Sequence, residues 1–144
     1  MNTELKIKRG IEVIQGCDDL VREWVSRELG VSIVGDVRCF GILDGGRIIG
    51  GAVLHNFKGF MVECSFATVD RRWCTRAGLR KFFDYVFNIL DIKRLHAACA
   101  RKNKKMRKLF NGLGFKYEGC ARKAFDGRQD AMIYSMLNNE CRWL

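Results

Sequence analysis

The chain has 144 residues, of which 48% are hydrophobic and 29% charged, and its formal net charge is +10 at pH 7. This length, with no linker, repeat or low-complexity segment, predicts one domain over 1–144. No apolar run approaches the ~20 residues that span a membrane, and the N-terminus lacks the apolar stretch of a signal peptide, so we expect a cytoplasmic protein with no membrane partner. The seven cysteines are odd in number and scattered without a CxxC pair, which argues against a disulfide framework or a metal site.

The first predicted elements are a strand over 7–14 and a helix over 18–29. Apolar residues recur along the helix at three- and four-residue spacing, as on the buried face of an amphipathic helix. Asp18 is a plausible N-cap, and Gly30 marks the end of the helix.

A hairpin, a strand and a second helix follow. Asp44-Gly45-Gly46 is a strong turn signal between the two apolar runs of 38–57, and a further strand is expected over 59–69. Apolar residues then recur at helical spacing over 75–90, which predicts a helix.

The last third returns to strands around one more helix. The pattern predicts a strand over 92–100, a helix that begins at Asn103 and ends at Gly114, and strands over 115–125 and 130–137. The order β-α-β-β-β-α-β-α-β-β predicts an α+β (mixed α/β) fold, with a mostly antiparallel sheet and one parallel β-α-β crossover over 60–100.

The junction "VDRRWCTRAGLRKFF" (69–83) suggests an anion site, because ligands of such units lie where a strand ends and a helix begins. The helix start offers unpaired backbone N–H groups and a positive dipole end, and Arg71, Arg72 and Arg76 add charge. The junction is poor in glycine, and a basic surface corner explains it about as well.

A second motif is "NKKMRKLFNGLGF" (103–115). Asn103 opens a helix directly after a strand, where it caps the helix or faces the cleft beside the crossover. The apolar stripe of this helix is assigned to the core.

Together the two motifs resemble the GNAT (GCN5-related N-acetyltransferase) superfamily, over about 38–137. Its Arg/Gln-x-x-Gly-x-Gly/Ala loop reads here as Arg72-Trp73-Cys74-Thr75-Arg76-Ala77, and its second block as Asn103 through Leu113-Gly114-Phe115, followed by Glu118-Gly119. The final strands look most like the branch that acetylates protein N-termini.

The resemblance implies an N-acetyltransferase that uses acetyl-CoA and an amine-bearing acceptor. The loop from Arg72 to Gly78 would hold the pyrophosphate through backbone N–H groups, the strand end would pair with the pantetheine arm, and Asn103 would contact the pantetheine or thioester. The acceptor would enter from the opposite side, between the splayed strands. The implied donor-binding residues are Thr68, Val69, Arg71, Arg72, Cys74, Thr75, Arg76, Ala77, Gly78 and Asn103.

Two positions depart from the family pattern. Thr75 stands where the first loop glycine is usual, and Phe110 stands where many members have a tyrosine that protonates the departing thiolate. Phenylalanine donates no proton, so the role is either vacant, which a CoA thiolate tolerates as a leaving group, or filled by another residue, for which Tyr117 and Tyr134 are the candidates.

Glu63, in the middle of a strand beside the expected cleft, is the candidate general base for the amine. Glu118, His55 and His96 are weaker candidates, and each has an ordinary structural explanation. Cys74 lies where arginines and a helix start would stabilise a thiolate, but it is read as a small packing residue.

Three functions therefore remain open: an acetyl-CoA-dependent N-acyltransferase, a catalytically degenerate relative that binds CoA, and a protein of this scaffold that acts on or binds nucleic acid. The last is motivated by the net charge and by "RKNKKMRK" (101–108). The oligomeric state is expected to be monomer or homodimer.

Overall fold

A computed structural model describes residues 10–144. Its centre is a seven-stranded sheet in the order β1-β2-β3-β4-β5-β7-β6, in which only the β4–β5 pair is parallel. The strands are β1 (Ile11–Gln15), β2 (Arg38–Asp44), β3 (Arg47–His55), β4 (Met61–Thr68), β5 (Arg94–Ala100), β6 (Lys116–Ala121) and β7 (Ala131–Leu137). The predicted α+β fold, its element order and its parallel crossover are confirmed.

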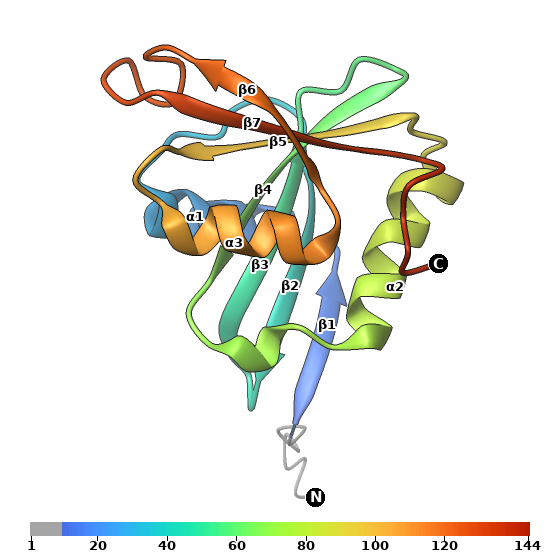
Figure 1. The fold of residues 1–144 in the computed structure, drawn as a ribbon. Coiled ribbons are helices and arrows are strands. Elements are labelled where there is room, and N and C mark those ends of the chain that lie inside the picture. Colours follow the sequence, from blue (N-terminus) through green and yellow to red (C-terminus); the bar gives the residue numbers. More distant parts are fainter. Residues whose placement is uncertain (1–9) are drawn as a thin grey trace, which may run out of the picture.

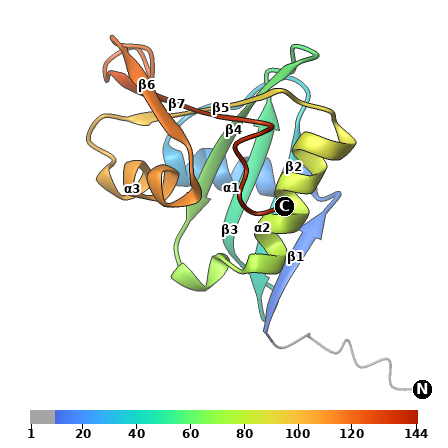
Figure 2. The same cartoon turned by 45° about the vertical axis from the view of Figure 1, so that its right-hand side comes forward.

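Helices cover both faces of the sheet (Figures 1 and 2). Helix α1 (Asp18–Leu29) lies on one face, and α2 (Arg76–Asp84) and α3 (Lys104–Leu113) lie on the other. Each face buries its own core: a smaller one under α1 around Val21, Val25 and Val53, and a larger aromatic one under α2 and α3. Because side chains alternate along a strand, odd-numbered residues of β4 face α1 and even-numbered ones face α2 and α3.

Local signals placed most element ends correctly. Gly30 and Gly114 close α1 and α3 in the left-handed conformation, and Gly45-Gly46 forms the β2–β3 turn. The predicted helix over 75–90 is α2 followed by a π-helical turn, η2 (Tyr85–Ile89). Within residues 10–144, no helix has the length and apolarity needed to cross a membrane.

Three details differ from the sequence prediction. The strand predicted over 115–125 is β6, which ends at Ala121, because residues 122–126 form turns. The first strand begins at Ile11, and residues 7–9 of the predicted strand lie outside the described part of the chain. The N-cap of α1 is Cys17 rather than Asp18. Asp18 lies one position inside the helix, and its Oδ1 accepts a hydrogen bond from the Cys39 backbone N–H at 2.9 Å, so it ties α1 to β2.

Close contact between α1 and β3 depends on Gly51. A Cβ at this position would lie 2.8 Å from Val25 Cγ2 and 3.1 Å from Val21 Cγ1. We expect Gly51→Ala to lower the free energy of unfolding by about 1–3 kcal/mol, because α1 must move away from the sheet. Urea unfolding measures the change.

Gly112→Ala is the matched control. Gly112 lies inside α3 with no heavy atom within 4 Å of an added Cβ, so alanine should raise the unfolding free energy by up to about 1 kcal/mol. Equal stabilities of Gly51→Ala and the unmodified protein would contradict the close packing of α1 on β3.

Candidate active site

The β4–α2 junction contains a short 3-10 turn, η1 (Arg71–Trp73), before α2 begins. Thr75 is the N-cap of α2, and its Oγ1 accepts a hydrogen bond from the Gly78 N–H at 3.0 Å. The first N–H groups of a helix have no intrahelical acceptor, and here those of Arg76 and Ala77 remain available. The junction therefore offers main-chain donors and a positive dipole end, although Thr75 already uses one donor.

The three arginines of the junction are not equivalent. The Arg72 guanidinium contacts Asp44 at 2.7 Å and Asp70 at 2.8 Å, and this pairing holds the pKa of Asp70 down at about 2. Within residues 10–144, Arg71 and Arg76 form no ion pair. Two of the three arginines are thus free to meet an anion, whereas the Arg72 charge is balanced by protein carboxylates.

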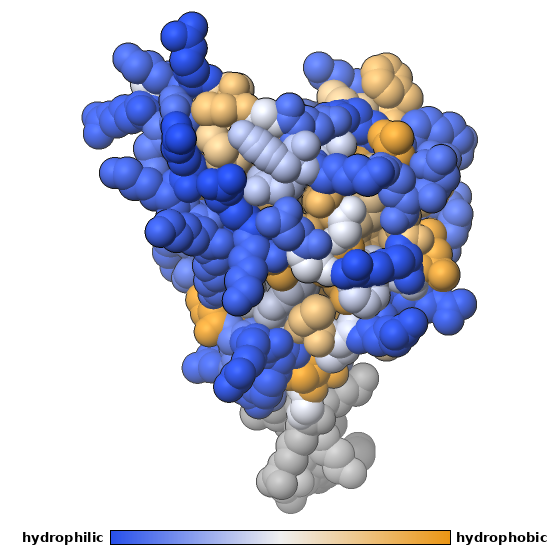
Figure 3. Space-filling model, viewed as in Figure 1, coloured by the Kyte–Doolittle hydropathy of each residue, from blue (hydrophilic) through white to orange (hydrophobic). Residues whose placement is uncertain are grey.

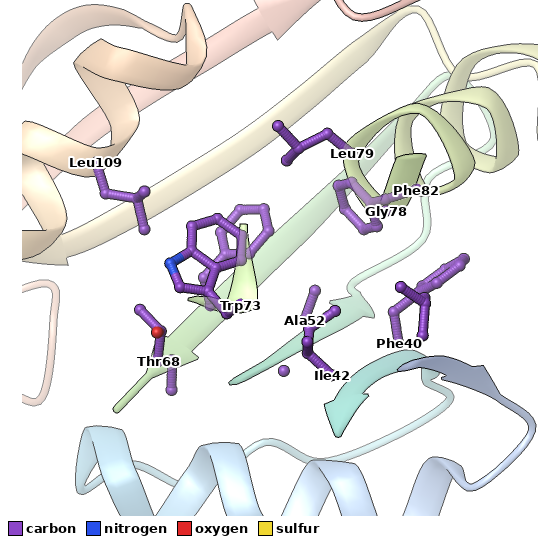
Figure 4. A pocket seen from close by; sticks show the side chains of 13 residues that line it. Phe40, Ile42, Ala52, Thr68, Trp73, Gly78, Leu79, Phe82 and Leu109 are labelled. Carbon is purple, nitrogen blue, oxygen red and sulfur yellow. The ribbon is translucent and has the colours of Figure 1, made fainter. Parts of the chain in front are cut away.

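Cys74 is exposed beside this junction, and partial burial of its sulfur raises the pKa of the thiol. The thiol is therefore not activated, although Cys74 is exposed and does not pack in the core as the sequence predicted. Its neighbour Trp73 turns inward and lies over Gly50, where an added Cβ would be only 3.0 Å from Trp73 Cβ. Trp73 and Leu109 flank an apolar pocket between α2, α3 and the sheet (Figure 4).

Strands β4 and β5 separate before they reach this junction. Their parallel pairing ends at Cys64 and Ala97, although both strands continue. Along β4 the peptide groups point alternately toward the two neighbouring strands. The Val69 N–H donates to the Ile49 carbonyl, next to β3, so the odd-numbered residues face β3 and the peptide groups of the even-numbered residues face β5. The peptide groups of Phe66 therefore face a gap in the sheet.

Helix α3 borders the gap. Lys105 Nζ of α3 donates a hydrogen bond at 2.8 Å to the carbonyl of Thr68, the last residue of β4. Asn103 is the N-cap of α3, because its Oδ1 accepts from the Met106 N–H at 3.1 Å, and its side chain also lines the space beyond the gap. Phe110 is buried against the rings of Phe66 and Tyr134, so it brings no hydroxyl group to the gap.

On the α1 side, the gap opens into a cavity. It is bordered by the segment after α1, by β3, β4 and β5, by the start of α3 and by the β6–β7 connection. Its polar side chains come from distant parts of the sequence: Ser32, His55, Glu63, Ser65 and Asn103.

Glu63 lies between two histidines, because the strand register pairs it with His55 of β3 and with His96 of β5. Its Oε2 accepts a hydrogen bond from Asn56 Nδ2 at 2.7 Å, and His55 Nε2 lies 2.9 Å from Ser65 Oγ. Burial lowers the pKa of both histidines, and the nearby Glu63 carboxylate opposes this shift only in part. Both imidazoles are therefore neutral near pH 7.

No family model matches the sequence, and no curated protein matches it. Among solved structures, a probable acetyltransferase shares 27% identity, with 74% of this chain and 64% of that chain covered and a TM-score of 0.61. A GCN5-related N-acetyltransferase from Brucella melitensis shares 24% identity, with 82% and 57% covered and a TM-score of 0.62. A spermidine N-acetyltransferase from Vibrio cholerae shares 18% identity, with 93% and 96% covered and a TM-score of 0.68.

The chain has the GNAT fold. The resemblance drawn from the two sequence motifs is thereby confirmed at the level of structure. The chain spans less than two thirds of the probable acetyltransferase and of the Brucella protein, but nearly all of the Vibrio spermidine enzyme.

Within this GNAT fold, the structure assembles the predicted residues in two groups. Thr68, Val69 and the residues of 71–78 form the junction after β4, whereas Glu63 and Asn103 line the cavity. Glu118 lies apart from the cavity lining, and its carboxylate pairs with Arg94 at 2.5 Å.

Sequence reasoning missed Ser65 and gave the histidines little weight. Ser65, His55 and Glu63 meet because β3 and β4 pair in one register that turns all three to the same face. The alternation in β4 places Glu63 and Ser65 on one face, and this signal was available. The β3–β4 register, which brings His55 to the same place, could not be read from the sequence.

Proposed function

We propose that this protein is an acetyl-CoA-dependent N-acyltransferase that moves an acetyl group directly to an amine. One observation carries the proposal: the gap between β4 and β5 opens into a cavity that holds Glu63, and the same strand β4 leads through η1 into a helix start with free N–H donors. Similarity to solved acetyltransferases supports the same reaction class.

The donor side fits a diphosphate and an extended amide chain. The N–H groups of Arg76 and Ala77, with the unpaired Arg71 and Arg76 guanidinium groups, would hold the diphosphate. The free Phe66 carbonyl would accept a hydrogen bond from an N–H of the amide arm, as from an added strand. The residues assigned to the donor remain Thr68, Val69, Arg71, Arg72, Cys74, Thr75, Arg76, Ala77, Gly78 and Asn103. Of these, Arg72 already donates both its main-chain N–H and its guanidinium to the Asp70 carboxylate.

On the acceptor side, Glu63 would take the proton that the attacking amine must lose. Acetyl-CoA supplies the activated thioester. Asn56 fixes the Glu63 carboxylate by its hydrogen bond, and the neutral histidines leave that carboxylate free to accept a proton. An amine-bearing acceptor, a monomeric or homodimeric state and a cytoplasmic location stay predictions.

Calorimetry with acetyl-CoA tests the donor assignment, and mass spectrometry of the purified protein for retained CoA tests it independently. Absence of binding at millimolar acetyl-CoA would overturn the proposal. Release of thiol with panels of amines and peptides then tests turnover, and binding without turnover would indicate the degenerate relative.

Nucleic acid is the second candidate partner, because positive charge is concentrated beside the cavity. Residues 101–108 and 122–130 contain nine basic and two acidic residues, and Arg101 joins the two segments through Asp130 at 3.7 Å. Figure 3 shows hydrophilic side chains gathered over α3 and the β6–β7 connection. Asn103 and Phe125 of these segments line the cavity, so an amine carried on a polyanion could reach Glu63.

A salt titration tests this candidate. Affinity for single-stranded RNA should fall steeply between low and moderate salt, with a slope of about −0.7 per phosphate contacted, and the Arg122→Glu/Lys123→Glu variant should flatten the slope. Arg80→Glu/Lys81→Glu, on the exposed side of α2, is the matched control. No RNA binding even at low salt would remove this candidate.

A further inference from the structure

We propose that Ser65 is an acyl acceptor within the protein, activated by His55, so that the chain acetylates Ser65 when no amine occupies the cavity. The inference rests on the proposed acyltransferase function, because the acetyl group must arrive through the gap beside Ser65. It adds an acetyl-serine route to the direct transfer described above.

The geometry is that of an activated nucleophile. His55 Nε2 lies 2.9 Å from Ser65 Oγ, and both side chains line the cavity. When the ring proton of His55 is on Nδ1, Nε2 accepts the Ser65 hydroxyl hydrogen, which is the arrangement a general base needs. Glu63, the register partner of His55, lies beside it on the same face of β4 as Ser65.

The surroundings suit the base. His55 is only 8% exposed, and burial lowers its pKa, so the imidazole is unprotonated and able to accept a proton near pH 7. Glu63 opposes that shift and His96 adds to it. The next residue, Phe66, directs its N–H into the gap, where it can donate to an oxygen that gains negative charge.

The acyl transfer to Ser65 needs only the serine, His55 and the thioester. Ser65 Oγ forms a bond to the thioester carbonyl carbon while its proton moves to His55 Nε2, and the carbon–sulfur bond then breaks. His55 returns that proton to the departing sulfur, which gives free CoA and acetyl-Ser65. This supplies the proton that Phe110 cannot donate. Attack by an amine or by water on the ester restores the Ser65 hydroxyl.

The test is mass spectrometry of the full chain after brief incubation with acetyl-CoA without amine, quenched in acid. A parallel incubation uses p-nitrophenyl acetate, an ester donor that needs no CoA site. Peptide mapping locates the added acetyl group, and neutral hydroxylamine separates a serine ester, which it removes, from a lysine amide, which it leaves. Circular dichroism confirms that each variant is folded.

We expect one acetyl group on Ser65 with both donors, its loss in Ser65→Ala, a strong decrease in His55→Gln, and acylation at the same position in Ser65→Cys. Ser135→Ala is the matched control, because Ser135 is a buried serine of the same sheet that does not line the cavity. It should keep the acetyl group on Ser65.

The two proposals fail in different ways. Transfer to amines with Ser65 unmodified, and with Ser65→Ala as fast as the unmodified protein, would overturn the serine route and leave the acyltransferase standing. Labelling of Ser65 by p-nitrophenyl acetate alone, without acetyl-CoA binding, would support the nucleophile and overturn the proposed function. Absence of Ser65 labelling with either donor would overturn the inference.

Discussion

Glu63→Gln is expected to slow acetyl transfer to an amine by about 10²–10⁴-fold, with acetyl-CoA binding unchanged, because glutamine cannot remove the amine proton. The substitution keeps the size of the side chain and leaves an acceptor oxygen for Asn56 Nδ2, so the strand should be undisturbed. Initial rates of CoA release at saturating acetyl-CoA measure the loss, and calorimetry measures binding.

Glu118→Gln is the control for this prediction. Its carboxylate is held by Arg94 and does not line the cavity, so its replacement should change the transfer rate little. A rate that falls in Glu118→Gln but not in Glu63→Gln would show that the base was assigned to the wrong carboxylate. An unchanged rate in both variants would point to water or a histidine as the base.

Ala77→Trp is expected to weaken acetyl-CoA binding at least about 100-fold, because the indole would cover the N–H donors of Arg76 and Ala77. Two hydrogen bonds to a charged group are each worth roughly 1.5–3 kcal/mol. Ala77 is exposed in the first turn of α2, so the chain should fold with its normal stability. Calorimetry with acetyl-CoA and thermal unfolding measure the two quantities.

Arg80→Trp provides the comparison, since Arg80 is exposed one turn further along α2, beyond the free N–H groups. It should bind acetyl-CoA nearly as tightly as the unmodified protein. Tight binding by Ala77→Trp would place the diphosphate elsewhere and remove the main support for the donor site.

Sequence patterns predicted the fold well because its boundaries are set locally. Gly30 and Gly114 end helices by adopting a left-handed backbone that other residues resist, and Asp44-Gly45-Gly46 turns a hairpin by the same chemistry. Hydrophobic spacing then fixes which side of each element is buried. Asp18 was misassigned as a cap because its partner, Cys39, lies on strand β2, which is distant from it in the sequence.

The site was less predictable, because its contacts join residues that are distant in the chain. Arg72 was read as an anion ligand, yet Asp44 of the β2–β3 turn meets it after folding and balances its charge. His55 reaches Ser65 only through the β3–β4 register. Residue types and spacing indicate which groups exist, whereas strand register decides which of them meet.

Thr75 changes what ligand binding at the junction involves. Its hydroxyl oxygen already occupies the Gly78 N–H, so a phosphate oxygen that used this donor would displace an internal acceptor rather than meet a bare one. One donor of the helix start is thus satisfied by its own sequence, and the loop does not need an anion at that donor to keep its shape. Affinity at this position depends on the difference between a charged and a neutral acceptor, and a glycine at residue 75 would remove that competition.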